Sequence, residues 1–249
     1  MLIKDEIYIP YLNSKRTLHI YFNKECDEPF NVLYMFDGHN LFSDNDATYG
    51  KSWGFKDYLD SHFHNLLIVG IECNHENNRR LYEYTPFNFN DRDNGFIRGE
   101  GKKFAEFIIN DLKPYIDHKY NVNKSREATA IGGSSLGALM SLYTGLTYEN
   151  TFGKIICISP FIYQMEKNIY RLIKNSRIYQ QRIYLSWGDC ETSLYHEDIN
   201  RCSLINNKIA YELTKQGKIV YPHFIKNGEH CEASWEKEIP VFMNELEIK

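Results

Sequence analysis

Apolar and polar residues along the first third of the chain follow the patterns of β-strands. Segments 6–11 and 17–23 alternate between the two types, as half-exposed antiparallel strands do. Segments 31–36 and 66–72 are almost continuously apolar, which is typical of parallel strands covered on both faces. The sequence therefore predicts a sheet that begins antiparallel and continues parallel.

The rest of the chain alternates between helical and strand patterns. Apolar residues recur at helical spacing over 102–120, where Pro114 either kinks the helix or begins a second one. A strand at 127–131, a turn at 132–137 and a helix beginning at 138 follow. Further strands are predicted at 154–159, 182–187 and 218–225, and further helices at 200–216 and 233–246.

This order of elements predicts the fold class. Strands that alternate with helices form a mostly parallel central sheet with helices on both faces. We therefore expect an α/β fold with antiparallel N-terminal strands, in a single domain over 1–249. Segment 160–181 is longer than a plain connection, and we expect it either to form a small cap over an active site or to pack as an ordinary helix.

Composition and charge exclude several classes of protein. Hydrophobic residues make up 43% of the 249 residues and charged residues 25%, as in folded globular proteins. The net charge of -4 comes without a long block of either sign, so a nucleic-acid partner is not expected. The sequence shows no run of about 18 apolar residues and no signal-peptide core, so we expect no membrane association and a cytoplasmic location.

The cysteines give no sign of a disulfide framework or of a metal site. They are Cys26, Cys73, Cys157, Cys190, Cys202 and Cys231, without a Cys-x-x-Cys pair or a zinc-type spacing with histidine. The sequence therefore predicts free thiols.

The most informative motif lies between the strand predicted at 127–131 and the helix that begins at 138. Gly133-Ser134-Ser135-Leu136-Gly137 fits the G-x-S-x-G pattern of a nucleophile elbow, which requires this strand, turn and helix context. Small residues on both sides of the serine let the strained turn push its hydroxyl into a cleft. Ser135 is the candidate nucleophile, and a tight glycine turn with an exposed serine is the alternative.

A base and an acid must accompany a serine nucleophile, and in such folds they follow it along the chain as acid, then histidine. His230 lies after the last predicted strand and before the last helix, which makes it the candidate base. The acid should follow the strand at 182–187, where Asp189 and Glu191 both occur. Spacing alone does not choose between these two carboxylates.

Backbone N–H groups must stabilise the oxyanion that ester hydrolysis forms. One donor should be the N–H of Leu136, next to the nucleophile. The other should come from the loop after the strand at 31–36, as the N–H of His39, with Asp37 bracing that loop.

Four separated segments belong together: 33–42 (LYMFDGHNLF), 80–86 (RLYEYTP), the elbow at 133–137 and 228–235 (GEHCEASW). They resemble a known family of esterases related to esterase D and to enterochelin (siderophore) esterases. The last segment reads Gly-x-His-x-Glu-x-x-Trp and resembles the histidine, glutamate and tryptophan pattern of that family. The resemblance spans nearly the whole chain. It implies the α/β-hydrolase fold and hydrolysis of a small carboxylic ester without metal or organic cofactor.

The resemblance also bears on individual residues. Glu191 occupies the last position of a Gly-x-x-Glu turn that the family shows after this strand, which favours Glu191 over Asp189. His39 stands where glutamine is usual in the family. Independently of the resemblance, Arg79 and Arg80 are candidates to meet an anionic substrate, although a pairing of Arg80 with Glu83 is the simpler expectation.

Three functions remain open on the sequence alone. The first is an esterase with Ser135, His230 and Glu191 as its triad, and the second is an acyltransferase that uses the same triad. The third is a binding protein that keeps the hydrolase fold without turnover, since a fold alone does not prove activity. The preferred ester and the oligomeric state are not fixed by any of these residues.

Overall fold

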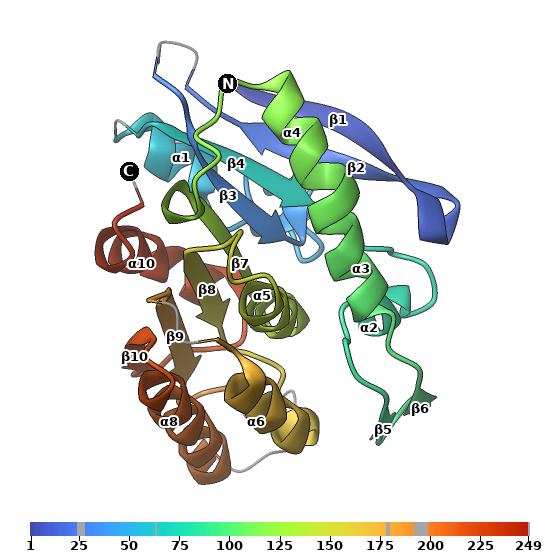
Figure 1. The fold of residues 1–249 in the computed structure, drawn as a ribbon, viewed down its shortest axis with the longest axis vertical. Helices are drawn as coiled ribbons and strands as arrows, with labels where there is room; N and C mark the ends of the chain where they lie inside the picture. The colour runs from blue at the N-terminus through green and yellow to red at the C-terminus, as the bar shows by residue number, and fades with distance from the viewer. Residues whose placement is uncertain (24–27, 63, 178–179, 192–198, 249) are drawn as a thin grey trace.

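The computed structural model describes residues 1–23, 28–62, 64–177, 180–191 and 199–248. Its main feature is an eight-stranded sheet in the order β1-β2-β4-β3-β7-β8-β9-β10 (Figure 1). The strands are β1 Leu2–Ile9, β2 Ser14–Tyr21, β3 Asn31–Phe36, β4 Leu66–Ile71, β7 Thr129–Ser134, β8 Lys154–Ile158, β9 Arg182–Gly188 and β10 Ile219–Ile225. The strands β5 Phe89–Asp91 and β6 Gly95–Ile97 form a separate two-stranded sheet.

The strand directions confirm the predicted fold class. β2 is antiparallel to both of its neighbours, β1 and β4. Every pair from β4 across the sheet to β10 is parallel. The carboxyl ends of β3, β7, β8, β9 and β10 therefore lie along one edge of the sheet, where ligands bind in open α/β folds.

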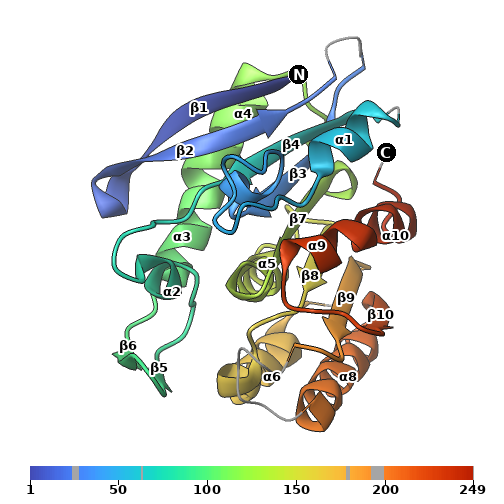
Figure 2. The same ribbon diagram turned by 180° about the vertical axis from the view of Figure 1, so that it is seen from behind.

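Helices cover both faces of the sheet, as predicted. One layer holds α3 Gly101–Phe107, α4 Lys113–Lys119, α5 Leu136–Thr147, α6 Glu166–Asn175 and α8 Ile199–Lys215 (Figure 1), and the other holds α1 Phe55–Asp60, α9 Glu232–Trp235 and α10 Ile239–Glu245 (Figure 2). Shorter turns are α2 Arg79–Glu83, the 3₁₀ turns Pro10–Leu12, Gly38–Asn40, Arg126–Ala128, Tyr163–Met165 and Glu236–Glu238, and a π-turn at Ile108–Leu112. In β3, Tyr34 and Phe36 enter the first layer, whereas Leu33 and Met35 enter the second.

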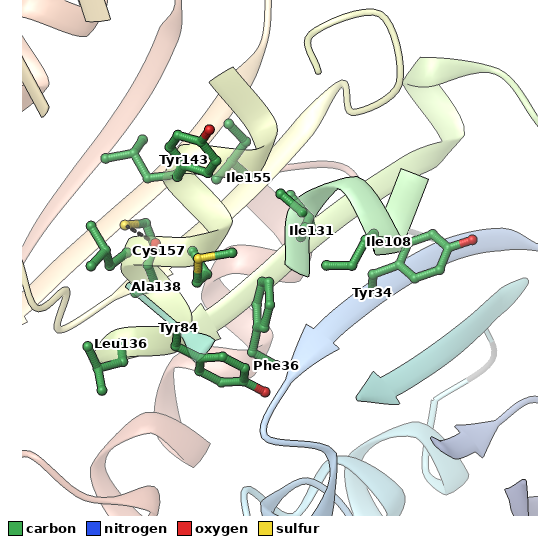
Figure 3. Close-up of a cluster of buried hydrophobic side chains, with 14 of the residues drawn as sticks. Tyr34, Phe36, Tyr84, Ile108, Ile131, Leu136, Ala138, Tyr143, Ile155 and Cys157 are labelled. Atoms are coloured by element: carbon green, nitrogen blue, oxygen red, sulfur yellow. Dashed lines mark hydrogen bonds between the residues drawn. The ribbon is translucent and has the colours of Figure 1, made fainter. Parts of the chain in front are cut away.

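The core of the first layer surrounds α5. Figure 3 shows Phe36 and Tyr84 beside this helix, with their rings packed edge to face at a centroid distance of 5.0 Å. Both side chains are almost completely buried, and burying a side chain of this size stabilises a fold by about 1.5–3 kcal/mol. Cys157 lies in the same core and donates a hydrogen bond from its thiol to the carbonyl of Ala138, at 3.4 Å. α5 is thus held firmly against the strand that precedes it.

The boundaries around the elbow differ from the prediction. The strand β7 runs through Gly132 to Ser134, and α5 already begins at Leu136, so the turn is much shorter than the predicted 132–137. Within the strand, position 132 has room only for glycine. A Cβ there would lie 2.7 Å from Met35 Sδ and 2.8 Å from Ile156 Cβ, which is too close. Gly132 is therefore required by crowding between neighbouring strands and not by a loop.

Two predicted helices are interrupted. The helix predicted at 102–120 is helical throughout Gly101–Lys119, but it contains the π-turn, and Pro114 follows that turn at the start of α4. The helix predicted at 233–246 is divided by a 3₁₀ turn, after which Pro240 stands in the first turn of α10. Each proline therefore lies where the regular α-helical hydrogen-bond pattern changes.

Segment 160–181, of which 178–179 lie outside the described residues, contains α6. This helix buries Ile169 and Ile173 and packs against α5 and α8. A cap function for the segment stays a prediction.

Five cysteines lie within the described residues, and all five are free thiols, as predicted. Cys26 lies outside them. Among the helices of the described residues, none is both long enough and apolar enough to cross a membrane.

Candidate active site

Ser135 stands at a strained turn between β7 and α5. Its backbone has φ 58° and ψ −121°, a conformation that residues with a side chain adopt only under constraint. Its N–H donates to the carbonyl of Ile158 at 3.0 Å, and its own carbonyl accepts from Phe161 N at 3.1 Å. The turn is thus tied to the chain that leaves β8, and the serine is 9% exposed at the carboxyl edge of the sheet.

Gly133 and Gly137 give this turn its room. A Cβ on Gly133 would lie 2.8 Å from the carbonyl carbon of Gly137, and a Cβ on Gly137 would lie 2.9 Å from Phe36 Cβ. Both distances are shorter than ordinary contacts between carbon atoms. The two glycines are therefore needed for the reason that the elbow motif predicts.

The turns after β9 and β10 bring Glu191 and His230 together. The backbones of Gly188 and Gly228 pack directly against each other. No side chain would fit between them, since a Cβ on Gly188 would lie 2.1 Å from the carbonyl oxygen of Gly228. Across this contact, Oε2 of Glu191 lies 3.5 Å from Nδ1 of His230, and both side chains are at most 7% exposed. A carboxylate in this position favours the imidazole tautomer that carries its proton on Nδ1.

Ser159 and Trp235 hold the carboxylate of Glu191 from the other side. Oε1 of Glu191 accepts hydrogen bonds from Ser159 Oγ and from the N–H of Gly188, each at 2.6 Å. Ser159 Oγ in turn accepts a bond from Trp235 Nε1 at 3.0 Å. The ring of Trp235 also packs edge to face against that of His230, at 5.1 Å. The two side chains thus orient both Glu191 and His230.

Asp189, the reserve candidate for the acid, lies differently. It is only partly buried, and its Oδ1 accepts a hydrogen bond from the exposed thiol of Cys190 at 3.3 Å. The structure therefore brings Glu191, and not Asp189, into the pair with His230.

The loop after β3, which carries His39, approaches the start of α5 at Asp37. Leu136 is the first residue of α5 and His39 lies within the one-turn helix Gly38–Asn40, so the N–H of each lacks a partner earlier in its own helix. α5 and the loop after β3 lie against each other at Gly137 and Asp37. A Cβ added to Gly137 would lie only 3.3 Å from Oδ2 of Asp37. The loop that carries His39 thus approaches the elbow at Asp37, and the role of the two N–H groups as oxyanion donors stays a prediction.

Arg80 of α2 braces this loop through Asp37. Its Nε and Nη2 donate to Oδ1 and Oδ2 of Asp37, each at 2.7 Å. Burial alone would raise the pKa of Asp37, but the charge and hydrogen bonds of Arg80 outweigh it and hold the pKa below its usual value. The expected pairing of Arg80 with Glu83 is wrong, because Glu83 instead accepts a hydrogen bond from the buried Arg16.

Asn40 joins the loop after β3 to the segment that carries His230. Its Nδ2 donates to Oε1 of Glu232 at 3.0 Å, and its Oδ1 accepts from the N–H of Thr48 at 2.9 Å. Burial raises the pKa of Glu232. The hydrogen bond between Asn40 and Glu232 links the loop that carries His39 with the segment that carries His230.

Comparison with known proteins identifies the family. Residues 9–245 match the family described as "Putative esterase". The chain belongs to this esterase family. The match confirms the resemblance seen in the sequence and makes the chain a carboxylic-ester hydrolase.

Individual relatives of this esterase cover most of its length. It is 31% identical to the uncharacterized protein YjcH of Bacillus subtilis over 234 residues, which are 90% of this chain and 88% of that protein. It is 30% identical to the ferri-bacillibactin esterase BesA of the same species over 147 residues, 57% of this chain and 48% of BesA. The crystal structure of the BES protein from Bacillus cereus has the same fold, with a TM-score of 0.74, 18% identity and coverage of 98% and 94%.

Sequence reasoning missed several residues that position the esterase site. Ser159 donates to Glu191 but lies 32 residues before it along the chain, so no local pattern joins the two. Trp235 lies in the segment 228–235 that resembles the family, but its contacts with Ser159 and His230 were not predicted. Gly188 and Gly228 also lie in segments that resemble the family, but their contact depends on the pairing of Gly188 with Ile225 between β9 and β10.

Replacing Gly228 by alanine should test this backbone contact. The new Cβ would lie 2.9 Å from Gly188 Cα, and relieving such overpacking typically costs about 1–3 kcal/mol. Because the two turns must separate, we expect ester hydrolysis to fall by about 100-fold, as misplacement of catalytic groups by 1 Å can cause. Thermal unfolding and kcat/KM measure the two effects.

Gly95→Ala is the matched control. Gly95 is the first residue of β6, directly after a hairpin turn, with φ 71° and open space around it. The substitution therefore adds backbone strain of about 1–2 kcal/mol without displacing a neighbour. We expect it to destabilise the protein and to leave kcat/KM within a few-fold of wild type. Full activity in Gly228→Ala would show that this contact does not position the site.

Proposed function

We propose that this esterase hydrolyses a small carboxylic ester through an acyl-enzyme on Ser135, with His230 as general base and Glu191 as the orienting acid. The main support for the proposal is the way in which the carboxylate of Glu191 is held. One carboxylate oxygen is held by Ser159 and Gly188, and the other faces Nδ1 of His230. A carboxylate fixed in this way stabilises the imidazolium that forms when the histidine takes a proton.

Acylation begins when Oγ of Ser135 attacks the ester carbonyl carbon and Nε2 of His230 takes the hydroxyl proton. The carbonyl oxygen becomes an oxyanion, which the N–H groups of Leu136 and His39 stabilise. His230 then gives the proton to the departing alkoxide, and the alcohol leaves. Water attacks the acyl-enzyme with His230 again as base, which releases the acid and restores Ser135.

The comparisons support a small-molecule ester as the substrate. The relative BesA is named for the hydrolysis of ferri-bacillibactin, so at least one related protein acts on a small-molecule ester.

A fluorophosphonate probe tests the proposed nucleophile directly. The reagent forms a covalent bond with a serine that an adjacent base activates, so we expect one adduct per chain, located at Ser135 by peptide mass spectrometry. The same protein unfolded in urea is the control, and it should not react. An adduct elsewhere, or none on a folded sample that hydrolyses p-nitrophenyl acetate, would refute the assignment.

A further inference from the structure

His39, Cys73 and His75 bring three metal-binding atoms together beside the oxyanion loop. One ring nitrogen of each histidine and the sulfur of Cys73 lie within 4.8 Å of one another, and no other such group of histidine, cysteine or acidic residues occurs among the described residues. His39 follows β3, and the other two follow β4. Because β3 and β4 are neighbouring parallel strands, their carboxyl ends bring the three side chains to one place.

In each of the two imidazoles, one nitrogen lies near an oxygen atom, and the other nitrogen is available to the cluster. Nε2 of His39 lies 3.0 Å from Thr48 Oγ1, which leaves Nδ1, a buried atom without a hydrogen-bond partner among the described residues. Nε2 of His75 lies 3.8 Å from Glu72 Oε2, while its Nδ1 lies 3.9 Å from Cys73 Sγ. Oxygen partners on the outer nitrogen are the usual arrangement around histidines that bind a metal.

The burial and packing of His39 make an unpaired nitrogen there unusual. The residue is 6% exposed, and its ring packs edge to face on that of His75 with centroids 4.5 Å apart. A buried polar atom that lacks a partner costs free energy, typically about 1–3 kcal/mol. A bound cation would remove that cost by accepting the lone pair of Nδ1.

We propose that His39, Cys73 and His75 form a binding site for a divalent cation of the zinc type. Two imidazole nitrogens and one thiolate suit such a cation, and three protein ligands leave a fourth position for water. Binding would replace the thiol proton of Cys73, which passes to solvent. The side chain of His75 is 53% exposed, so it can move the short distance needed to close the site.

The site is separate from the triad but shares one residue with the oxyanion loop. The backbone N–H of His39 belongs to the proposed esterase mechanism, whereas its side chain belongs to the cluster. The proposal concerns binding of the cation only and does not depend on Ser135.

Titration with Co²⁺ tests the site by absorption spectroscopy. We expect the wild-type protein to bind one equivalent, with a thiolate-to-cobalt charge-transfer band and the visible bands of tetrahedral Co²⁺, both displaced by Zn²⁺. Cys73→Ser should lose the charge-transfer band. His75→Ala should weaken binding by at least about 100-fold, since loss of an outer-shell partner alone costs 10–100-fold.

Two variants control for binding elsewhere. Cys190→Ser removes an exposed thiol and His62→Ala removes an exposed histidine that lies near His64, and both should bind Co²⁺ as wild type does. His75 is exposed, so His75→Ala is expected to fold, which circular dichroism verifies. Wild-type protein without the charge-transfer band, the band retained in Cys73→Ser, or unchanged affinity in His75→Ala would each overturn the proposal.

Discussion

Ser135→Ala should lower kcat/KM for p-nitrophenyl acetate by at least about a thousandfold, and by up to on the order of a millionfold if all turnover passes through the acyl-enzyme. The variant keeps the elbow, the N–H of Leu136 and the pair of Glu191 with His230, so only the attacking oxygen is lost. The alanine methyl fits where the serine side chain lies, and the thermal unfolding midpoint should change little. Steady-state hydrolysis and thermal unfolding of the purified variant measure both quantities.

Ser134→Ala is the matched control for this substitution. Ser134 is the preceding residue in β7 and is 6% exposed. Each of the two variants therefore removes one hydroxyl oxygen from a buried position, and the two positions are adjacent. We expect Ser134→Ala to keep kcat/KM within a few-fold of wild type. If Ser135→Ala retained normal turnover, or if Ser134→Ala were the inactive variant, the nucleophile would be wrongly assigned.

Glu191→Gln should lower kcat by about 10⁴-fold, whereas Asp189→Asn should change it by no more than a few-fold. A glutamine has the shape of glutamate but no negative charge, and comparable loss of the orienting carboxylate in a serine protease has this magnitude. Ser159 Oγ and Gly188 N both donate to one oxygen of Glu191, so an amide NH₂ is disfavoured there and would point at His230 instead. The imidazole would then be held in the wrong tautomer.

The comparison of the two variants uses kcat together with the thermal unfolding midpoint. Asp189 shares its turn with Glu191 but contacts Cys190, so Asp189→Asn reproduces the loss of charge without the loss of the pair. A larger effect of Asp189→Asn on kcat would move the acid to that residue. Equal, small effects would remove the acid from the mechanism altogether.

The sequence was informative wherever a local motif fixes the chemistry. Gly133, Ser135 and Gly137 fall within five residues, and their strand and helix context is visible in the apolar pattern on both sides. His230 was predicted as the base from its position after the last strand, and the preference for Glu191 as the acid came from the family turn. These features need only short-range information.

Contacts between distant segments were not predictable in this way. Arg80 was expected to pair with Glu83 on its own helix, but it pairs with Asp37. Asp37 is 43 residues away along the chain and is within reach because the fold brings α2 to the loop after β3. Likewise, the His39 side chain was not expected to meet Cys73 and His75. Burial lowers the pKa of His39 to about 4, so this imidazole is neutral at pH 7, which no sequence pattern indicates.

The position of β10 at the end of the sheet makes catalysis more fragile than the fold. This strand pairs only with β9 among the described strands, and most of its side chains are partly or fully exposed. Edge elements with little buried apolar surface open at a lower free-energy cost than the centre of a domain. Local detachment of β10 would move the proposed base His230 while α5 and its elbow remain folded. On the proposed mechanism, activity would then be lost before the domain as a whole unfolds.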